Sequence, residues 1–149
     1  SLGTLRGASP IYETAPLAGG PPQPDYLNQA ARLESPLPPQ ALLAALLQLE
    51  ARAGRVRDPG QRYAARTLDL DVLLLGEHGQ GTFESPELQI PHPRLHQRTF
   101  ALRPLLDLDP TLQHPRLGPL VRLLADWQRQ HPDEAPPSLI RVDPEPRVV

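Results

Sequence analysis

Two aspartates placed two positions apart are the residues of this sequence best suited to hold a metal ion. Asp69 and Asp71 lie in an apolar run from Arg66 to Gly76. A run of this composition predicts a buried strand, on which residues two apart point to the same side. The Cα atoms would be about 6.5–7 Å apart, and the carboxylates would repel each other by about 2 kcal/mol at an effective dielectric constant of about 20. We therefore expect a cation between them.

An arginine-rich segment precedes the aspartates, on a predicted helix end followed by a Gly/Pro loop. Its five arginines are Arg52, Arg55, Arg57, Arg62 and Arg66. A run of charge is often no more than a solvated surface. Beside two carboxylates, however, it indicates a site for a magnesium-bound nucleotide, because carboxylate oxygens suit Mg²⁺ and guanidinium groups bind polyphosphate.

A second group of polar residues follows the aspartates, between His92 and Phe100. The four-residue spacing of His92 and His96 would let a helix present both rings to zinc, but Pro93 between them and the lack of an adjacent glutamate disfavour this. Contact of His92 and Arg98 with phosphate is the better functional interpretation. Ordinary surface groups, with Phe100 in the core, are the alternative.

Composition bounds the class of protein. A chain of 149 residues fits one domain, and a net charge of −2 gives no overall attraction to nucleic acid or to membranes. Without cysteine, disulfides and Cys-based zinc sites are excluded. No apolar run approaches the length of about 18 residues that a membrane span needs. We expect a cytoplasmic protein.

The predicted elements alternate between strands and helices. Residues 40–53 form the clearest helix, with Gly54 after its end and Glu50 facing away from its leucine stripe. A second, amphipathic helix covers 119–130. Strands are expected at 4–13, 25–34, 66–76 and 88–90, with a further short strand at 139–142. The last part of the chain, residues 132–149, is a proline-rich tail, and residues 1–131 form the domain.

Several motifs in this order resemble the hydroxymethyl-dihydropterin pyrophosphokinase family of folate synthesis. The resemblance covers residues 5 to 112. Its most diagnostic part is Arg-Thr-Leu-Asp-Leu-Asp at 66–71. The other matching segments are Tyr12–Leu17, Gln23–Asn28, Gly54–Arg57 and Ile90–Pro93, followed by Arg98 and Phe100.

The resemblance implies a single α+β domain with a ferredoxin-like antiparallel sheet covered by helices. It implies an ATP-dependent enzyme, acting as a monomer, that transfers pyrophosphate from ATP to the hydroxymethyl group of 6-hydroxymethyl-7,8-dihydropterin and releases AMP. In the family this needs two Mg²⁺ ions. The family's opening strand and helix have no counterpart here, so we also expect the sequence to lack an N-terminal segment of the domain.

The resemblance also assigns roles by position. Asp69 and Asp71 would hold the metal ions, and Arg55, Arg57 and Arg66 would be catalytic. The ATP site would consist of Glu50, Arg57, Tyr63, Arg66, His92 and Arg98. The pterin site would consist of Thr14, Ala15, Leu17, Tyr26, Asn28 and Phe100. An aromatic face and an amide suit a flat heteroaromatic ring with donors and acceptors along its edge.

Two alternatives to this function remain. One is a two-metal nucleotidyltransferase that uses the same Asp-x-Asp, although the glycine-serine motif and third carboxylate expected of it are not found. The other is a catalytically incomplete homologue or fragment that binds a nucleotide or a partner without turnover.

Overall fold

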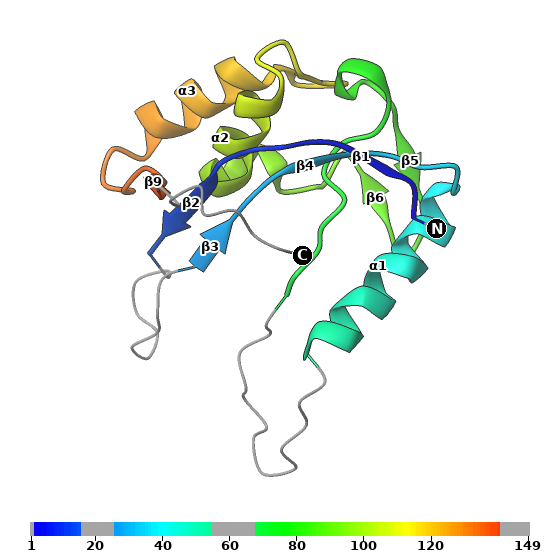
Figure 1. Ribbon diagram of the computed structural model, residues 1–149. Coiled ribbons are helices and arrows are strands. Elements are labelled where there is room, and N and C mark those ends of the chain that lie inside the picture. The colour runs from blue at the N-terminus through cyan, green and yellow to red at the C-terminus, as the bar shows by residue number, and fades with distance from the viewer. Residues whose placement is uncertain (1, 16–25, 55–67, 141–149) are drawn as a thin grey trace.

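The computed structural model describes residues 2–15, 26–54 and 68–140. In these ranges the chain is an α+β domain, as predicted, with three α-helices and short antiparallel strands (Figure 1). The helices are α1 (Pro39–Gly54), α2 (Thr99–Leu108) and α3 (Leu120–Gln130), and two short 3-10 turns lie at Glu77–Gly79 and Leu95–Gln97. The strands are β1 (Thr4–Ala8), β2 (Ile11–Thr14), β3 (Tyr26–Asn28), β4 (Ala31–Glu34), β5 (Phe83–Glu84), β6 (Gln89–Ile90), β7 (Gln113–His114), β8 (Gly118–Pro119) and β9 (Ser138–Ile140). Within the described ranges, no helix is long and apolar enough to cross a membrane.

The two long N-terminal strands predicted from sequence are each broken once, at facing positions. Residues 4–13 divide into β1 and β2 around Ser9 and Pro10, and residues 25–34 divide into β3 and β4 around Gln29 and Ala30. The Ser9 N–H donates to the Ala30 carbonyl at 2.8 Å, and the Ala30 N–H donates to Ser9 Oγ at 2.9 Å. Because the polar groups are paired across the break, the two strand pairs form one bent ribbon.

Among the described residues the strands form small antiparallel sheets. β1 pairs with β4, and β2 lies between β3 and β9 in a three-stranded antiparallel sheet. β5 pairs with β6, and β7 pairs with β8. The strand predicted near residue 139 is confirmed as β9, and the one at 88–90 is confirmed as β6.

The strand predicted over residues 66–76 is wrong for the part that the structure describes. Residues 68–74 belong to no strand, and Leu75 makes only a single antiparallel bridge, to Gly81. Among the described residues no segment lies alongside 68–74 in register, and an apolar run becomes a strand only if it has a partner to pair with. The Leu73 carbonyl instead accepts the His92 N–H at 2.9 Å.

The hydrophobic core lies between α2, α3 and the bend of the ribbon. Leu95, Leu102 and Leu120 are completely buried. The core cluster consists of Ala30, Leu95, Leu102, Leu105, Leu106, Leu120 and Leu124. The helix α2 was not predicted, because Pro104 lies in its middle, yet this proline is itself among the fully buried side chains.

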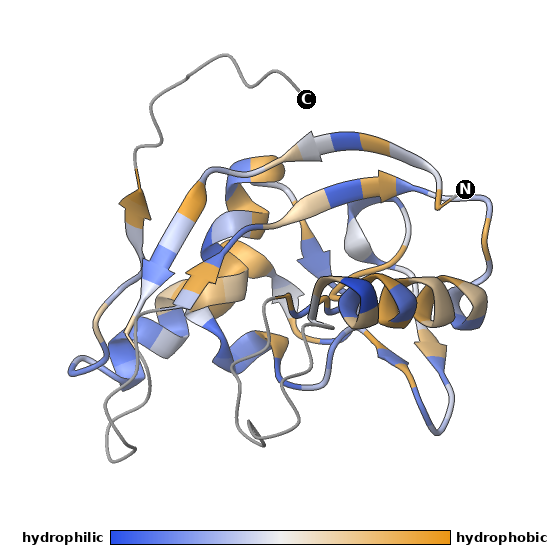
Figure 2. Cartoon of the chain, turned by 60° about the horizontal axis from the view of Figure 1, so that its bottom comes forward, coloured by the Kyte–Doolittle hydropathy of each residue, from blue (hydrophilic) through white to orange (hydrophobic). Residues whose placement is uncertain are grey.

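The helix α1 is confirmed with one more residue at each end than predicted, but it contributes nothing to this core. It lies apart from α2 and α3 (Figure 1) and has no buried residue. Its composition is largely apolar, as its colours in Figure 2 show, and Leu47 is 53% exposed. The ribbon β1–β4 is also open to solvent, with Leu5 62% exposed.

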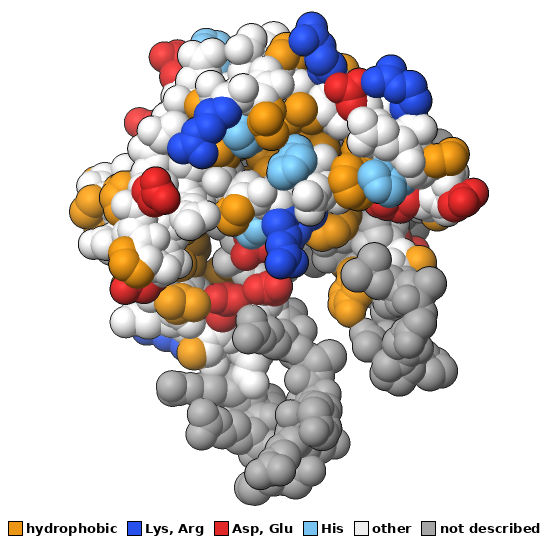
Figure 3. Space-filling view, turned by 180° about the vertical axis from the view of Figure 1, so that it is seen from behind, with side chains coloured by type: hydrophobic (Ala, Val, Ile, Leu, Met, Phe, Trp, Pro, Cys, Tyr) orange, Lys and Arg blue, Asp and Glu red, His pale blue; other side chains and the backbone are white. Residues whose placement is uncertain are grey.

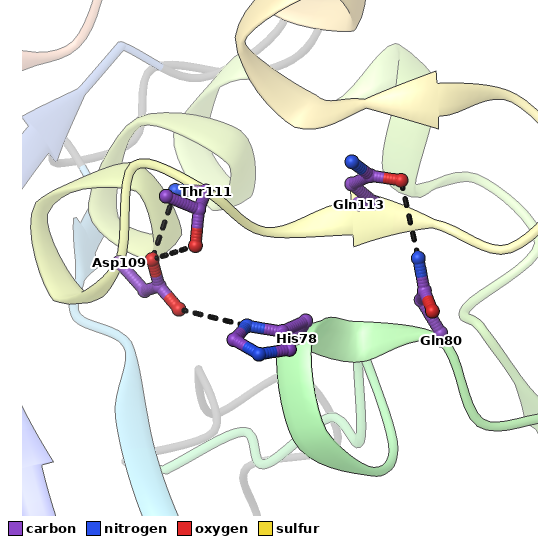
Figure 4. A network of polar contacts seen from close by, with 5 residues as sticks. All are labelled: His78, Gln80, Asp109, Thr111 and Gln113. Atoms are coloured by element: carbon purple, nitrogen blue, oxygen red, sulfur yellow. Dashed lines mark hydrogen bonds and ion pairs between the residues drawn. The ribbon is translucent and has the colours of Figure 1, made fainter.

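A polar network ties the loop after Leu75 to the segment that follows α2 (Figure 4). Asp109 Oδ1 accepts hydrogen bonds from the Thr111 N–H at 2.8 Å and the Thr111 hydroxyl at 2.6 Å, and these bonds lower the pKa of Asp109. His78 Nδ1 lies 4.0 Å from Asp109 Oδ2. Gln80 donates to Gln113 Oε1 at 3.1 Å. The network anchors the loop from Gly76 to Gly81, which leads from the aspartates to β5.

Candidate active site

The cation beside one of the two aspartates is an arginine from α2's first turn. Arg98 Nη1 lies 3.4 Å from Asp71 Oδ2, and the Arg98 guanidinium carbon is 5.6 Å from the centre of the Phe100 ring. The side chains of Arg98 and Asp71 are 25% and 45% exposed. Residues from the two segments that the sequence singled out therefore meet, and both charged groups can be reached by a ligand.

Both aspartates face solvent rather than the leucines around them. Along the segment Asp69 to Val72, the exposed aspartates alternate with the half-buried Leu70 and Val72. The alternation predicted for this run is therefore present although no strand forms. Since each carboxylate is open to solvent on one side, both can supply oxygen ligands to a hydrated cation.

Glu50 contacts the same segment from α1. Its Oε2 accepts the backbone N–H of Leu70 at 3.2 Å, so the carboxylate lies against the peptide between the two aspartates. We had predicted either a nucleotide contact or a solvated glutamate at this position. The structure shows a half-buried side chain whose observed contact holds the aspartate-bearing segment to the helix.

His92 lies close enough to this pair for both charges to affect it. Partial burial lowers the pKa of His92, the nearby Arg98 and Arg94 cations lower it further, and Asp71 opposes them. The Arg94 N–H donates to His92 Nδ1 at 3.1 Å. The ring is therefore neutral near pH 7 and carries its hydrogen on Nε2, which makes it a donor there.

A pocket of about 290 Å³ opens beside Asp71 and His92. Its polar lining consists of Asp71, Glu87, Gln89 and His92, and its apolar lining includes Leu43, Val72, Pro86 and Leu88. A cleft of this mixed character can hold a flat base against its apolar side chains while an attached charged group extends toward Asp71.

On the β2–β3 hairpin, two of the predicted pterin-site residues contact each other. Asn28 Nδ2 donates to Thr14 Oγ1 at 3.0 Å across the pair, and α2, which carries Phe100, packs against both strands. Tyr26 is 52% exposed and Ala15 is exposed at the end of β2.

Five predicted site residues lie outside the described residues, so the structure does not test them. They are Leu17, Arg55, Arg57, Tyr63 and Arg66. Within the described ranges, no group of three or more His, Cys, Asp or Glu side chains could hold a metal ion. This leaves Asp69 and Asp71 as a pair of carboxylates and gives no support to a zinc site at His92 and His96.

One face of the molecule mixes both signs of charge. Figure 3 shows histidine and arginine side chains gathered above a group of acidic side chains.

Two further polar groups near the site were not found from sequence. One joins Tyr12 on β2 to Asp107 and Arg103 on α2, and the other joins Thr99 and Trp127 to Glu134. Each connects residues of different elements, so no spacing along the chain signals it.

The α+β domain has paired carboxylates, an arginine against one of them and an adjoining base-sized pocket. This combination is typical of the class of polyphosphate-handling enzymes. The comparison with known proteins narrows this class. The model of the family 7,8-dihydro-6-hydroxymethylpterin-pyrophosphokinase matches residues 2–110, and the chain belongs to this family.

Relatives from several bacteria carry the name 2-amino-4-hydroxy-6-hydroxymethyldihydropteridine pyrophosphokinase. The one from Pseudomonas aeruginosa is 44% identical over 121 residues, which is 81% of this chain and 71% of the relative. The one from Haemophilus influenzae is 39% identical over 121 residues, or 79% and 72% of the two chains. For the Synechocystis relative the identity is 42% over 101 residues, and the match spans 68% of this chain and only 49% of the relative.

Proposed function

We propose that this protein transfers pyrophosphate from ATP to the hydroxymethyl group of 6-hydroxymethyl-7,8-dihydropterin and releases AMP. The names of its family and its relatives, which state a pyrophosphokinase of this hydroxymethyl-dihydropterin, support the proposal. In this reaction the substrate hydroxyl oxygen attacks the β-phosphorus, the bond from that phosphorus to the AMP oxygen breaks, and the hydroxyl proton is lost. The observation that carries the proposal is the contact of Arg98 with Asp71.

The two aspartates suit Mg²⁺, with ATP as the co-substrate. Mg²⁺ in nucleotide enzymes is commonly bound by one or two carboxylates and completes its shell with phosphate oxygens and water. Asp69 and Asp71 supply hard oxygen ligands on an exposed edge, and we propose that they hold two such ions. When bound, the metal would neutralise the charge of the transferring phosphates.

Arg98, His92 and the pocket beside Asp71 would each have a part in placing ATP. Arg98 contacts Asp71 through Nη1 alone, so another of its five N–H donors can bind a phosphate oxygen while this contact is kept. Neutral His92 can donate its Nε2–H to a neighbouring phosphate oxygen. The pocket beside Asp71 would take the adenine against its apolar side chains. Since phosphoryl transfer depends on positioning and charge, these contacts can supply much of the catalysis.

We assign the second substrate to the β2–β3 hairpin and α2. Phe100 and Tyr26 would enclose the pterin ring, while Asn28 and the chain from Thr14 to Leu17 would bind its polar edge. The Asn28 to Thr14 hydrogen bond supports this, because it fixes the amide on the strand pair that packs against α2. Arg55, Arg57, Arg66 and Tyr63 complete the proposed site from the segment before Asp69, with Arg57 closing on the phosphates.

The remaining parts of the proposal concern the whole protein. We propose a ferredoxin-like arrangement in the complete domain, a monomer, and action in the cytoplasm without nucleic-acid or membrane partners. The net charge of −2 supports the absence of a polyanion partner.

The test is an assay of AMP release from ATP and 6-hydroxymethyl-7,8-dihydropterin. Turnover should require both substrates and Mg²⁺, and should stop when EDTA is added and resume when Mg²⁺ is restored in excess. Folded protein that binds ATP but releases no AMP would favour the alternative of a homologue without turnover.

A further inference from the structure

Glu134, in the turn between α3 and β9, contacts α2 between two residues of the proposed site. Its Oε1 accepts the hydroxyl of Thr99 at 3.1 Å, and its Oε2 accepts the indole N–H of Trp127 at 2.8 Å. Thr99 is only 4% exposed and is the first residue of α2. Its neighbours in the chain are Arg98 and Phe100.

The turn that carries Glu134 is itself held in place. The Glu134 N–H donates to the His131 carbonyl at 3.1 Å, and the His131 N–H donates to the Trp127 carbonyl at 2.9 Å. The rings of Trp127 and His131 stack with centroids 3.6 Å apart. Figure 1 shows this turn leading from the end of α3 to β9. The carboxylate is therefore presented to α2 from a fixed support.

The beginning of α2 needs such a partner. Arg98 is its N-cap and makes no side-chain capping hydrogen bond. The first N–H groups of a helix lack partners within the helix and give this end a partial positive charge. A carboxylate bound to the first residue is thus placed where it stabilises the first turn.

We infer that Glu134 is a positioning residue: by holding Thr99 it fixes the turn that aims Arg98 at Asp71 and Phe100 at the second substrate. The inference deepens the proposed function and rests on it for its kinetic readout. Glu134 itself touches no substrate, but its loss frees the segment that carries Arg98 and Phe100.

Kinetic comparison of four variants tests the inference. Glu134→Ala removes both hydrogen bonds and should lower kcat/KM for ATP and for the pterin by about tenfold, the effect of losing a hydrogen bond to a charged group. Glu134→Gln can still accept from Trp127 and donate to the Thr99 oxygen, so it should stay within about threefold of the wild type. Thr99→Val, which keeps the shape of the side chain, should resemble Glu134→Ala. Asp133→Ala is the matched control, because it removes a neighbouring exposed acid and should leave kcat/KM unchanged.

A second measurement keeps the inference testable even if the protein shows no turnover. The amides of Ala101 and Leu102 donate to the Arg98 carbonyl at 3.0 and 2.9 Å. In Glu134→Ala their hydrogen exchange should quicken by about tenfold, while the Asp109 amide at the other end of α2 keeps its wild-type rate. Wild-type exchange at Ala101 and Leu102 in Glu134→Ala would overturn the inference. So would equal loss of kcat/KM in Glu134→Ala and Asp133→Ala, or a Gln variant as impaired as the Ala variant.

Discussion

At the scale of single residues, Asp71 has the most informative contact in the site. The sequence predicted a cation between two like charges, and Arg98 lies against one of them at 3.4 Å. Because both side chains are partly exposed, this ion pair contributes little to stability, about 0–1 kcal/mol. In the proposed function, the ion pair would instead place a polyphosphate ligand beside a carboxylate that holds Mg²⁺.

Replacing Asp71 by asparagine should therefore separate activity from stability. Asp71→Asn should lower kcat/KM by about a hundredfold or more, because a charge that acts in the transition state is lost. The free energy of unfolding should change by less than about 1 kcal/mol. AMP release and urea denaturation measure the two effects. Asp126→Asn, which removes an exposed carboxylate paired with Arg129 on α3, is the control and should keep full activity. Near-normal turnover in Asp71→Asn would show that this carboxylate is structural.

His114 provides a residue-scale prediction about pH. It is 8% exposed, and its Nδ1 accepts the N–H groups of Arg116 and Leu117 at 3.1 Å each. Burial, and then the His96 and Arg116 charges, lower the pKa of His114 below the ordinary value of 6.5. As the pH falls, His114 therefore becomes protonated at a higher pH in the unfolded chain than in the folded protein. The stabilisation is complete above about pH 6.5 and is lost as pH falls through the lower native pKa.

Urea denaturation at a series of pH values measures this loss. The variant His114→Asn keeps an acceptor near the Nδ1 position but cannot titrate, so its unfolding free energy should fall less than that of the wild type below about pH 6.5. Comparison at about pH 8, where the histidine is neutral in both states, gives the cost of the substitution itself. Parallel curves for the two proteins would exclude His114 as a source of the pH dependence.

Some of the site could be predicted from residue types and some could not. Asp69 and Asp71 stood out because two acids within an apolar run need a cation, and His92, Arg98 and Phe100 stood out through their order in the family motifs. The structure brings Asp71, Arg98 and Phe100 together. Glu134 and Asp107 did not stand out. Neither acid belongs to a recognisable motif, and their contacts with Thr99 and Tyr12 span 35 and 95 residues of the chain.

At the scale of elements, composition predicted α1 and α3 well but not which helices form the core. Runs of leucine and alanine predict a helix because they have high helix propensity, and α1 forms as expected. Propensity does not say what the helix packs on. The core instead includes α2, a helix that was not predicted because it contains a proline. The segment at 68–74 shows the same limit, since an apolar run cannot reveal whether a partner strand is present.

The difference between the helices predicts very different costs for one substitution. Leu102→Ala, at a completely buried position of α2, should lower the unfolding free energy by about 2–5 kcal/mol, because it leaves a cavity. Leu47→Ala, at a 53% exposed position of α1, should change it by less than about 1 kcal/mol. Leucine and alanine are both strong helix formers, so propensity contributes little to either value. Urea denaturation of the two variants measures the contrast, and comparable losses would mean that α1 is buried in solution.

At the scale of the whole molecule, one polar group joins the β3–β2–β9 sheet to the helical layer. The Tyr12 hydroxyl donates to Asp107 Oδ2, and Arg103 Nη2 contacts Asp107 Oδ1 at 2.8 Å. Tyr12 is 8% exposed, and burial followed by the bond to Asp107 raises its pKa above the ordinary value of 10.0. The group thus ties β2, which leads to Thr14, to the helix that carries Phe100.

Replacing Tyr12 by phenylalanine should weaken this tie without disturbing the core. The ring stays and Asp107 keeps Arg103, so the loss should be about 1.5–3 kcal/mol, the value of a hydrogen bond to a charged acceptor. The loss should also depend on pH. Because the native pKa is raised, the hydroxyl stabilises the wild type fully below about pH 10, and this stabilisation disappears as pH rises through the native value. Unfolding free energies of the two proteins should therefore differ by a constant amount up to about pH 10 and converge as the pH rises above it, as measured by urea denaturation in the alkaline range. If the difference in unfolding free energy between the two proteins stays constant at alkaline pH, the hydroxyl does not join the sheet to α2 by donating its proton.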